Sequence, residues 1–393
     1  MNYQLGLFYG VFFLIYGLGN FYIGWRGWQA FSSIFASNRL AWCWAGGVAL
    51  LALSFPLGRF VSHYAPHYLG KIIIYIGSYW MAAMYYLLLI LIICDLLRLI
   101  NRFTNVLPSS LRGKFPLLTL MVLALVAIIL IYGTWNSRHP VVRNYEVTLP
   151  PKSSSIESMK VVVVSDVHLG WIVGIDRLQQ MTEIINTLEP DLVLFPGDIV
   201  DEGVDLEAEQ EMPAVLHSLH PQFGTYAVLG NHEYISGNAE TTIGFLEQNG
   251  IRVLRDQAVE IENCFYLVGR DDASRHRFNG SERLELPQIM NEVDASKLPV
   301  ILLDHEPFNL GVSEQAGVDL QFSGHTHLGQ IFPNNYITHA IYEQDWGYLR
   351  KNTLQLIVSC GYGTWGPPIR VGNRPEIVHV LVHFSPLEYS KNS

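Results

Sequence analysis

Charged residues are scarce in this chain, and they are unevenly placed. Asp, Glu, Lys and Arg make up 15% of the 393 residues, whereas a globular protein carries about 25%. Residues 1–136 hold eight basic residues and a single acidic one, and the rest of the chain holds the other 17 basic and 34 acidic residues. This division predicts an apolar membrane part followed by an acidic, water-soluble part. Nucleic-acid binding is excluded, because neutralising phosphates requires a cationic face.

Cysteine is also rare, and no two cysteines have the C-x-x-C spacing of a thiolate zinc or redox site. The absence of such pairs excludes these sites and a disulfide scaffold. The four cysteines are interpreted as buried structural thiols: Cys43, Cys94, Cys264 and Cys360. No internal repeat or low-complexity segment is visible.

Long uncharged stretches are abundant in the first third of the chain. A membrane-spanning helix needs about 20 apolar residues, and four windows reach that length. We therefore predict a four-helix transmembrane anchor over residues 1–136. The first window lacks the basic start of a signal peptide. The windows are residues 1–25, 40–58, 72–94 and 115–137.

Asp95 is the one acidic residue of this region, and it is expected to form an interfacial ion pair with Arg98. Because transport paths are marked by ionisable groups inside the membrane, we predict an anchor rather than a transporter. The positive-inside rule slightly favours a cytoplasmic position for the first and third loops, and so an extracytoplasmic soluble domain. The basic residues of the first and third loops are Arg26, Arg39, Arg98, Arg102, Arg112 and Lys114. Those on the side of the soluble domain are Arg59, Lys71, Arg138, Arg143 and Lys152.

Residues 137–158, rich in proline and serine, are expected to form a linker, residues 159–385 a folded domain and residues 386–393 a tail. Short β-branched runs alternate with helix-period segments in the domain, which predicts an α/β fold with a sheet core. The expected strands are 161–165, 192–195, 225–229, 265–268, 300–303, 320–322, 354–358 and 377–382, and the expected helices 175–188, 207–219 and 239–248.

Polar motifs follow five of these strands. Open α/β sheets place ligands at the carboxyl ends of their strands, so the motifs are expected to meet at one edge. Oxygen and imidazole donors without thiolate suit Mn, Fe, Zn or Ni. The nine histidines outside the motifs are interpreted as surface or core residues. The motifs are Asp166-Val-His168, Gly197-Asp198-Ile-Val-Asp201, Gly230-Asn231-His232-Glu233, Asp304-His305-Glu306 and Gly324-His325-Thr326-His327.

The order of these motifs resembles that of the calcineurin-like metallophosphoesterase superfamily over residues 158–384. The resemblance implies an α/β/β/α sandwich and two divalent metal ions. The first ion would be held by Asp166, His168, Asp198 and His327, and the second by Asp198, Asn231, His305 and His325, with Asp198 bridging. His232 would be a proton donor or electrostatic stabiliser and not a ligand. Asp201, Glu233 and Asp304 are three candidates for the carboxylate that orients a ligating imidazole.

Residues 361–370 and 374–376 are similar to those of a membrane-associated bacterial branch, which includes enzymes similar to UDP-2,3-diacylglucosamine pyrophosphatases. We therefore expect a metal-dependent phosphohydrolase of a bacterial inner or plasma membrane. Its substrate would be a phosphate ester or pyrophosphate that is lipid-linked or periplasmic. The alternatives are a membrane scaffold or sensor built on an inactive phosphoesterase fold, and a transporter with a regulatory domain. No predicted ligand is missing, which counts against the first alternative.

Overall fold

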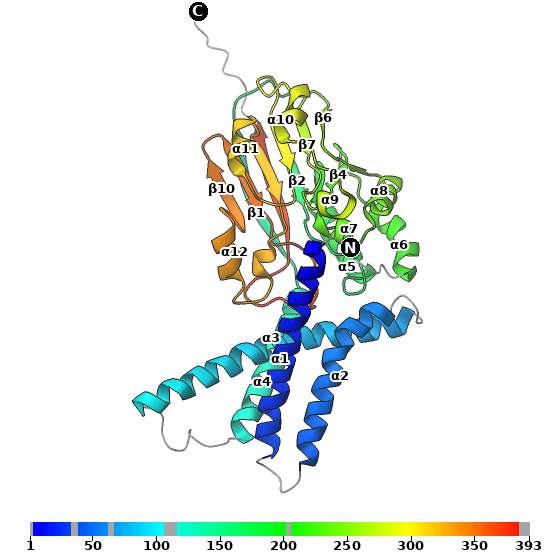
Figure 1. The fold of residues 1–393 in the computed structure, drawn as a ribbon. Coiled ribbons are helices and arrows are strands. Elements are labelled where there is room, and N and C mark those ends of the chain that lie inside the picture. The colour runs from blue at the N-terminus through cyan, green and yellow to red at the C-terminus, as the bar shows by residue number, and fades with distance from the viewer. Residues whose placement is uncertain (1–2, 33–37, 62–66, 106–115, 202–205, 385–393) are drawn as a thin grey trace, which may run out of the picture. The chain divides into compact units, whose positions relative to one another are not determined.

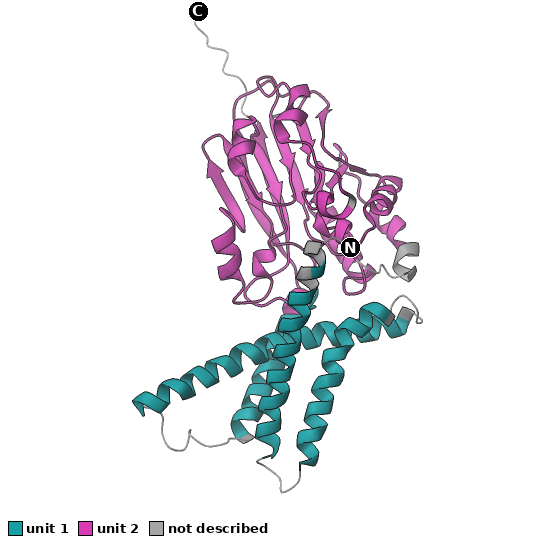
Figure 2. Ribbon diagram, in the orientation of Figure 1, with its two compact units in different colours: residues 1–134, 366–369 teal, residues 135–365, 370–393 magenta. Residues whose placement is uncertain are grey.

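The computed structural model describes residues 3–32, 38–61, 67–105, 116–201 and 206–384, so the predicted tail at 386–393 lies outside the described residues. The chain divides into two compact units (Figure 2). Unit 1 comprises residues 1–134 and 366–369, and unit 2 comprises residues 135–365 and 370–393.

Unit 1 is built from long apolar helices. They are α1 (Tyr3–Ser32), α2 (Arg39–Val61), α3 (His67–Thr104) and α4 (Pro116–Ser137). Three segments are long and apolar enough to cross a membrane, namely Arg39–Phe60, Tyr68–Thr104 and Leu117–Ser137. The structure therefore supports three candidate spans among the described residues. The span predicted at 1–25 stays a prediction, although α1 makes most of that segment helical.

The polar groups of unit 1 are paired with one another. Asp95 forms the expected ion pair with Arg98 and a second ion pair with Arg26. Asp95 does not lie at the end of its helix, because α3 continues to Thr104. Trp80 Nε1 donates to the buried Asn20 Oδ1 at 2.8 Å. These pairings satisfy polar groups on helices that are otherwise apolar.

Unit 2 contains two six-stranded mixed sheets (Figure 1). The first has the order β1-β12-β2-β3-β4-β5, and its strands β2 to β5 are parallel. The second has the order β10-β11-β9-β8-β7-β6, with β11, β9, β8 and β7 parallel. The bounds of the first sheet are β1 (Val141–Leu149), β2 (Ser158–Val163), β3 (Leu192–Pro196), β4 (Thr225–Val228), β5 (Ile251–Val253) and β12 (Glu376–Phe384). Those of the second are β6 (Gln257–Ile261), β7 (Phe265–Gly269), β8 (Val300–Leu303), β9 (Leu320–Ser323), β10 (Gly347–Lys351) and β11 (Leu354–Val358).

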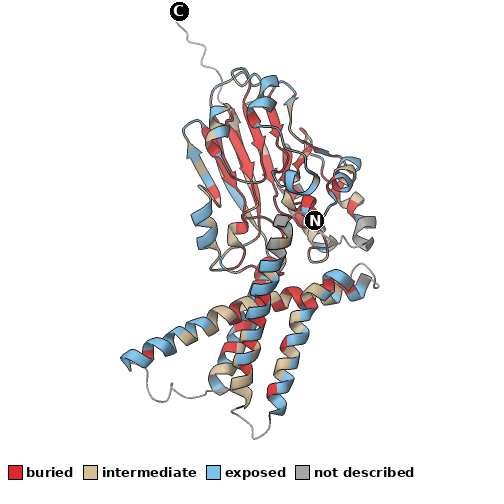
Figure 3. Cartoon of the chain, viewed as in Figure 1, coloured by how far each residue is buried: buried red, intermediate tan, exposed pale blue. Residues whose placement is uncertain are grey.

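The central strands are buried on both faces (Figure 3). This burial explains why they are continuous apolar runs rather than alternating ones. One cluster of apolar side chains joins the facing sides of the two sheets, for example Val161 and Leu194 with Phe322. Helices cover the outer faces, α5 (Ile175–Thr187), α6 (Leu206–Leu216) and α8 (Ala239–Gln248) on the first sheet and α10 (Leu286–Ile289) and α11 (Leu310–Gln315) on the second.

The predicted strand positions and the structure agree closely. The predicted elements at 239–248, 300–303 and 354–358 coincide with α8, β8 and β11. Four strands, β1, β5, β6 and β10, were not predicted. Residues 251–253 are too short to show a period, and β6 and β10 are half-exposed edges with mixed polarity.

The prediction of a linker over 137–158 is wrong for its central part. β1 occupies Val141–Leu149 and pairs in parallel with β12 over its whole length, from Val141 opposite Glu376 to Leu149 opposite Phe384. As an edge strand it is buried mainly near its end, at Val147 and Leu149. Its charged residues interrupt the apolar pattern that indicates a strand, so no strand was predicted there. Its pairing partner lies more than 200 residues away in sequence.

Candidate metal centre

The five predicted motifs come together at one edge of unit 2. Each follows the carboxyl end of a strand, in the order β2, β3, β4, β8 and β9. Five of the predicted ligands have a left-handed backbone with φ between 49° and 69°, a conformation that is uncommon for residues other than Gly. Such strain is typical of functional sites. The five are Asp166, His168, Asp198, His325 and His327.

Gly230 shows why these turns need small residues. A Cβ atom at Gly230 would lie 2.2 Å from Asp198 Oδ1. The glycine therefore allows the loop after β4 to pass close to the loop after β3. The backbone amide of His232 then donates to Asp198 Oδ1 at 2.8 Å.

The first group of donors consists of Asp166, His168 and His327. Nε2 of His168 lies 3.0 Å from Nε2 of His327, and the latter lies 3.3 Å from Asp166 Oδ1. All three residues are buried. Their ligand atoms are close enough to one another to hold one cation.

The second group consists of Asp198, Asn231, His305 and His325. Asp198 Oδ2 lies 3.2 Å from His305 Nε2. His325 Nδ1 lies 2.8 Å from Asn231 Oδ1 and 3.3 Å from His305 Nε2. Asp198 Oδ2 also lies 3.9 Å from His168 Nε2, so this carboxylate stands between the two groups.

The donor set fits divalent cations. Burial lowers the pKa of His325 to about 3, and burial with His168 holds the pKa of His327 well below its usual range, so both rings are neutral and can ligate. Burial would lower the pKa of His305, but Asp198 outweighs burial and raises it well above the usual range. Burying a carboxylate is costly unless a positive charge lies nearby, and metal ions bound here would supply that charge.

Asp201 contacts two of the predicted site histidines. Its Oδ1 lies 3.2 Å from His232 Nδ1, and its Oδ2 lies 3.5 Å from His168 Nδ1. Burial lowers the pKa of His232, but the charges of Asp198 and Asp201 raise it overall to about 9. Burial raises the pKa of Asp201, but the neighbouring imidazoles of His168 and His232 outweigh burial and hold it well below the usual range.

The structure separates the three carboxylates proposed to orient an imidazole. Only Asp201 among them faces ring nitrogens of site histidines in this way. Glu233 accepts the backbone amides of Ile199, Val200 and Gly230 at 2.7, 2.9 and 2.8 Å, which joins the loops after β3 and β4. Asp304 pairs with Arg270 at 2.9 Å and Arg283 at 3.1 Å. His305 is held instead by the carbonyl of Pro196, 2.8 Å from its Nδ1.

Arg370 is a site residue for which no role was predicted. Its side chain is fully buried, and Nη2 lies 3.2 Å from His327 Nδ1. The guanidinium donates to the carbonyls of Gly361 and Gly363, and the amide of Gly363 donates to the carbonyl of Asp166 at 2.7 Å. The segment after β11 thus supports the first donor group from behind. The sequence signal for it was its place in the segment 361–370 that resembles a membrane-associated branch, and that resemblance assigned it no role.

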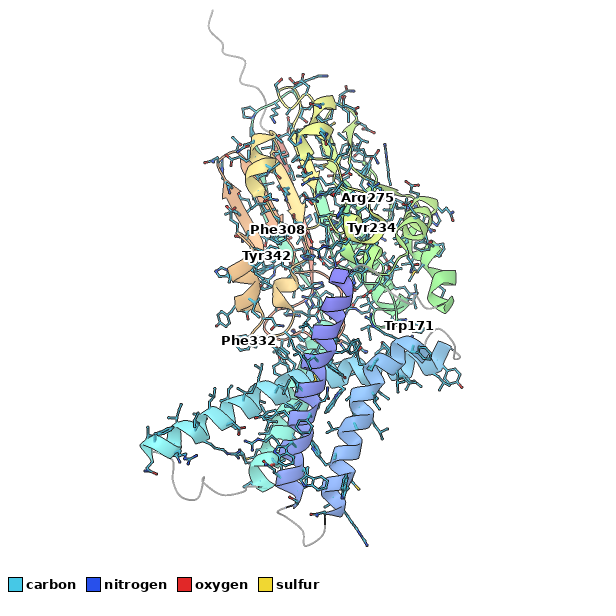
Figure 4. The ribbon with its side chains drawn as sticks, viewed as in Figure 1. Trp171, Tyr234, Arg275, Phe308, Phe332 and Tyr342 are labelled. Carbon is cyan, nitrogen blue, oxygen red and sulfur yellow. The ribbon has the colours of Figure 1, made fainter. Side chains whose placement is uncertain are left out.

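A cavity of about 430 Å³ opens over the cluster. One side is formed by site residues, including Asn231, His232 and His325. The apolar and aromatic residues that line the cavity, here called the apolar wall, are Ile337, Ile341, Tyr342 and Trp365, and Gln330, Asn334 and Thr338 also line it. Tyr342 lies beside Phe308 in Figure 4, with ring centroids 4.6 Å apart. No sequence motif predicted this wall.

Several histidines outside the motifs lie elsewhere. His379 and His383 contact Asn144 and Glu146 of β1, and His339 is exposed. These three positions agree with the expectation of surface residues. His63 lies outside the described residues.

Comparison with known proteins identifies the family of this arrangement. A sequence profile described as "Calcineurin-like phosphoesterase" matches residues 159–329. An uncharacterized metallophosphoesterase of Aquifex aeolicus is 36% identical over 236 residues, which are 59% of this chain and 87% of the relative. A "Transmembrane protein with metallophosphoesterase domain" of Danio rerio is 26% identical over 357 residues, covering 86% of this chain and 80% of that protein. A protein of the same description from Bos taurus is 30% identical over 285 residues, covering 69% of this chain and 63% of that protein. The chain therefore belongs to the calcineurin-like metallophosphoesterases and is a phosphoester hydrolase with membrane-type apolar helices.

Proposed function

We propose that this protein is a membrane-anchored, dinuclear metal-dependent phosphohydrolase that cleaves a phosphate ester or pyrophosphate bond. The observation that carries the proposal is the position of Asp198 between two groups of donors. One of its oxygens lies 3.2 Å from a nitrogen of the second group and 3.9 Å from one of the first. A single carboxylate can bridge two ions in this position.

The two groups supply complete ligand sets for Mn, Fe, Zn or Ni. Asp166, His168, Asp198 and His327 would hold one ion, and Asp198, Asn231, His305 and His325 the other. When bound, two such ions provide Lewis acidity for the phosphate oxygens and acidify the attacking water.

His232 is proposed to donate a proton to the leaving oxygen. It lines the cavity, and it is not needed in either ligand set. Asp201 holds the ring through Nδ1, which leaves Nε2 as the atom that faces a substrate. General acid assistance of this kind contributes about 10²–10⁴-fold to a rate.

Residues 1–136 are proposed to act as a four-helix anchor in a bacterial inner or plasma membrane, with residues 159–385 as the catalytic domain on the extracytoplasmic side. The three candidate spans support the anchor, and the fourth span would be α1. An anchored enzyme meets amphiphilic substrates at the membrane surface, so we propose a lipid-linked phosphate ester or pyrophosphate as the substrate.

Metal analysis combined with a substrate panel tests the proposal. The full chain would be purified in detergent, its bound metals counted, and hydrolysis measured on phosphate monoesters, diesters and pyrophosphates. We expect two metals per chain and hydrolysis of at least one class. Two bound metals without hydrolysis of any class would favour the scaffold or sensor, and one metal per chain would contradict the dinuclear centre.

A further inference from the structure

The apolar wall and several of the predicted ligands line the same cavity. Ile337 and Ile341 lie four residues apart on α12 (Asn335–Ile341), which places them on one face of the helix. Each is 58% exposed, although both line the cavity. Isoleucines this exposed contribute little to the core, and their apolar surface is free to contact a ligand in the cavity.

Two aromatic residues complete the wall at either end. The indole of Trp365 is 53% exposed, and its ring centroid lies 5.8 Å from that of His232. The ring of Tyr342 lies 6.2 Å from that of His325. The wall therefore begins next to the proposed proton donor and ends next to a proposed ligand of the second ion.

The wall is held in place by buried polar groups. Gln330 pairs with the backbone of Trp365 through two hydrogen bonds, of 2.9 Å to the carbonyl and 2.8 Å from the amide. Asp345 accepts from Thr338 of α12 at 2.7 Å, and its carbonyl accepts from Thr326 at 2.6 Å. Because Thr326 lies between His325 and His327, α12 is tied directly to the ligand loop. A wall fixed in this way is preorganised for binding.

The charges of the residues that line the cavity limit the class of ligand that it can bind. Among the described residues that line it, none is lysine or arginine. A polyphosphate or a nucleotide would bring further negative charges that this lining does not neutralise. An apolar group attached to the phosphate matches the isoleucine and aromatic side chains.

We propose that the apolar wall is a specificity subsite for an alkyl or aryl group carried by the phosphate of the substrate. This inference rests on the proposed function, because the ligand groups must hold that phosphate. It assigns Ile337, Ile341, Tyr342 and Trp365 to recognition, and it defines the substrate as an amphiphilic phosphate with its apolar part within the cavity.

The test measures binding of alkylphosphonates, which cannot be hydrolysed. Methyl-, propyl- and hexylphosphonate are short enough to stay monomeric in water. They would be titrated by calorimetry into the full chain, loaded with Mn²⁺ in phosphatidylcholine nanodiscs, with empty nanodiscs as the blank. We expect affinity to rise about two- to fourfold per buried methylene group.

The variant that tests the wall is Ile337→Ser combined with Ile341→Ser. Both side chains are largely exposed, so the fold should persist, and an unchanged melting temperature would verify this. We expect this variant to bind methylphosphonate within twofold of the wild type but to lose most of the dependence on chain length. Tyr336→Ser is the matched control, because Tyr336 is 67% exposed on the same helix but does not line the cavity.

Four outcomes would overturn the subsite. If the affinity of the wild type does not depend on chain length, the wall does not bind the ligand. The same conclusion follows if this dependence persists in the double variant. An equal loss in Tyr336→Ser would assign the exposed face of α12 to the bilayer or to another chain. Failure of metal-loaded wild type to bind even methylphosphonate would instead contradict the proposed phosphate site, and the subsite with it.

Discussion

Asp201 Oδ1 lies 3.2 Å from Nδ1 of His232, at the carboxyl edge of the first sheet. The other oxygen of Asp201 lies 3.5 Å from Nδ1 of His168, so one carboxylate lies beside both the proposed proton donor and a proposed metal ligand. The imidazoles of His168 and His232 lie edge to face, with centroids 4.6 Å apart. The proposed acid and the proposed metal ligand are therefore neighbours. Substitutions of single residues should separate their roles.

His232→Ala should keep its metals and melting temperature, because the side chain belongs to neither ligand set. Its kcat should fall by at least about 100-fold on esters with poor leaving groups, which need a proton in the transition state. The loss should be smaller for a nitrophenyl ester. Equal losses on both esters would leave an electrostatic role and remove the acid role, and unchanged rates would remove His232 from the site.

Asp201→Asn should shift the pH profile. The negative charge of Asp201 helps to raise the pKa of His232. A general acid works below its pKa, so activity on a poor leaving group should fall as pH rises through that pKa. Without the charge the pKa of His232 falls, and this alkaline decline should move to lower pH. Profiles of kcat/KM for the wild type and the variant would check this, and an unmoved decline would contradict the pairing.

Asp198→Asn should lose more metal than His232→Ala, because Asp198 is the carboxylate shared by both donor groups. The amide is neutral and cannot neutralise two cations. Counting bound metals after identical dialysis of the two variants would measure the difference. Full occupancy of both metals in Asp198→Asn would contradict a bridging role.

Glu233→Gln should reduce stability, because the fully buried carboxylate accepts three backbone amides. An amide side chain cannot accept all three, and an unpaired buried donor costs about 1–3 kcal/mol. The free energy of unfolding from denaturant titration would measure the loss. Glu240→Gln is the control, since Glu240 is 76% exposed and pairs at the surface with Arg255, and it should change stability little.

The stability of a truncated protein should depend on whether it retains β1. A protein that starts at Trp135 retains Asn136, whose side chain donates to the carbonyls of Arg370 and Asn373, and all of β1. It should be soluble, bind metal and hydrolyse a small chromogenic ester. A protein that starts at Lys152 exposes the edge of β12 and should aggregate or melt at lower temperature. A folded, metal-loaded but inactive Trp135 truncation would show that unit 1 contributes to catalysis.

The sequence by itself determined most of the donor cluster. Asp166, His168, Asp198, Asn231, His305, His325 and His327 each follow a short apolar run, and an apolar run of this kind predicts a buried strand from local residues alone. The carboxyl ends of parallel strands meet at one edge of a sheet, so predicting the strands predicts that the side chains after β2, β3 and β4 converge, and likewise those after β8 and β9. The packing of the two sheets against each other then brings these two groups together. The apolar windows of residues 1–136 are a similarly local signal, since hydropathy depends on composition alone.

Only the tertiary structure decided which partners these residues have. The partner of Asp201 is separated from it by 31 residues and that of β1 by more than 200, and no periodicity encodes either pairing. Asp201, Glu233 and Asp304 are equivalent in sequence terms, yet one lies beside histidines, one accepts backbone amides and one pairs with arginines. The apolar wall exists because Asp345 and Gln330 hold α12 and Trp365 beside the cluster. Such contacts depend on the distances between folded segments, which the order of residues along the chain does not contain.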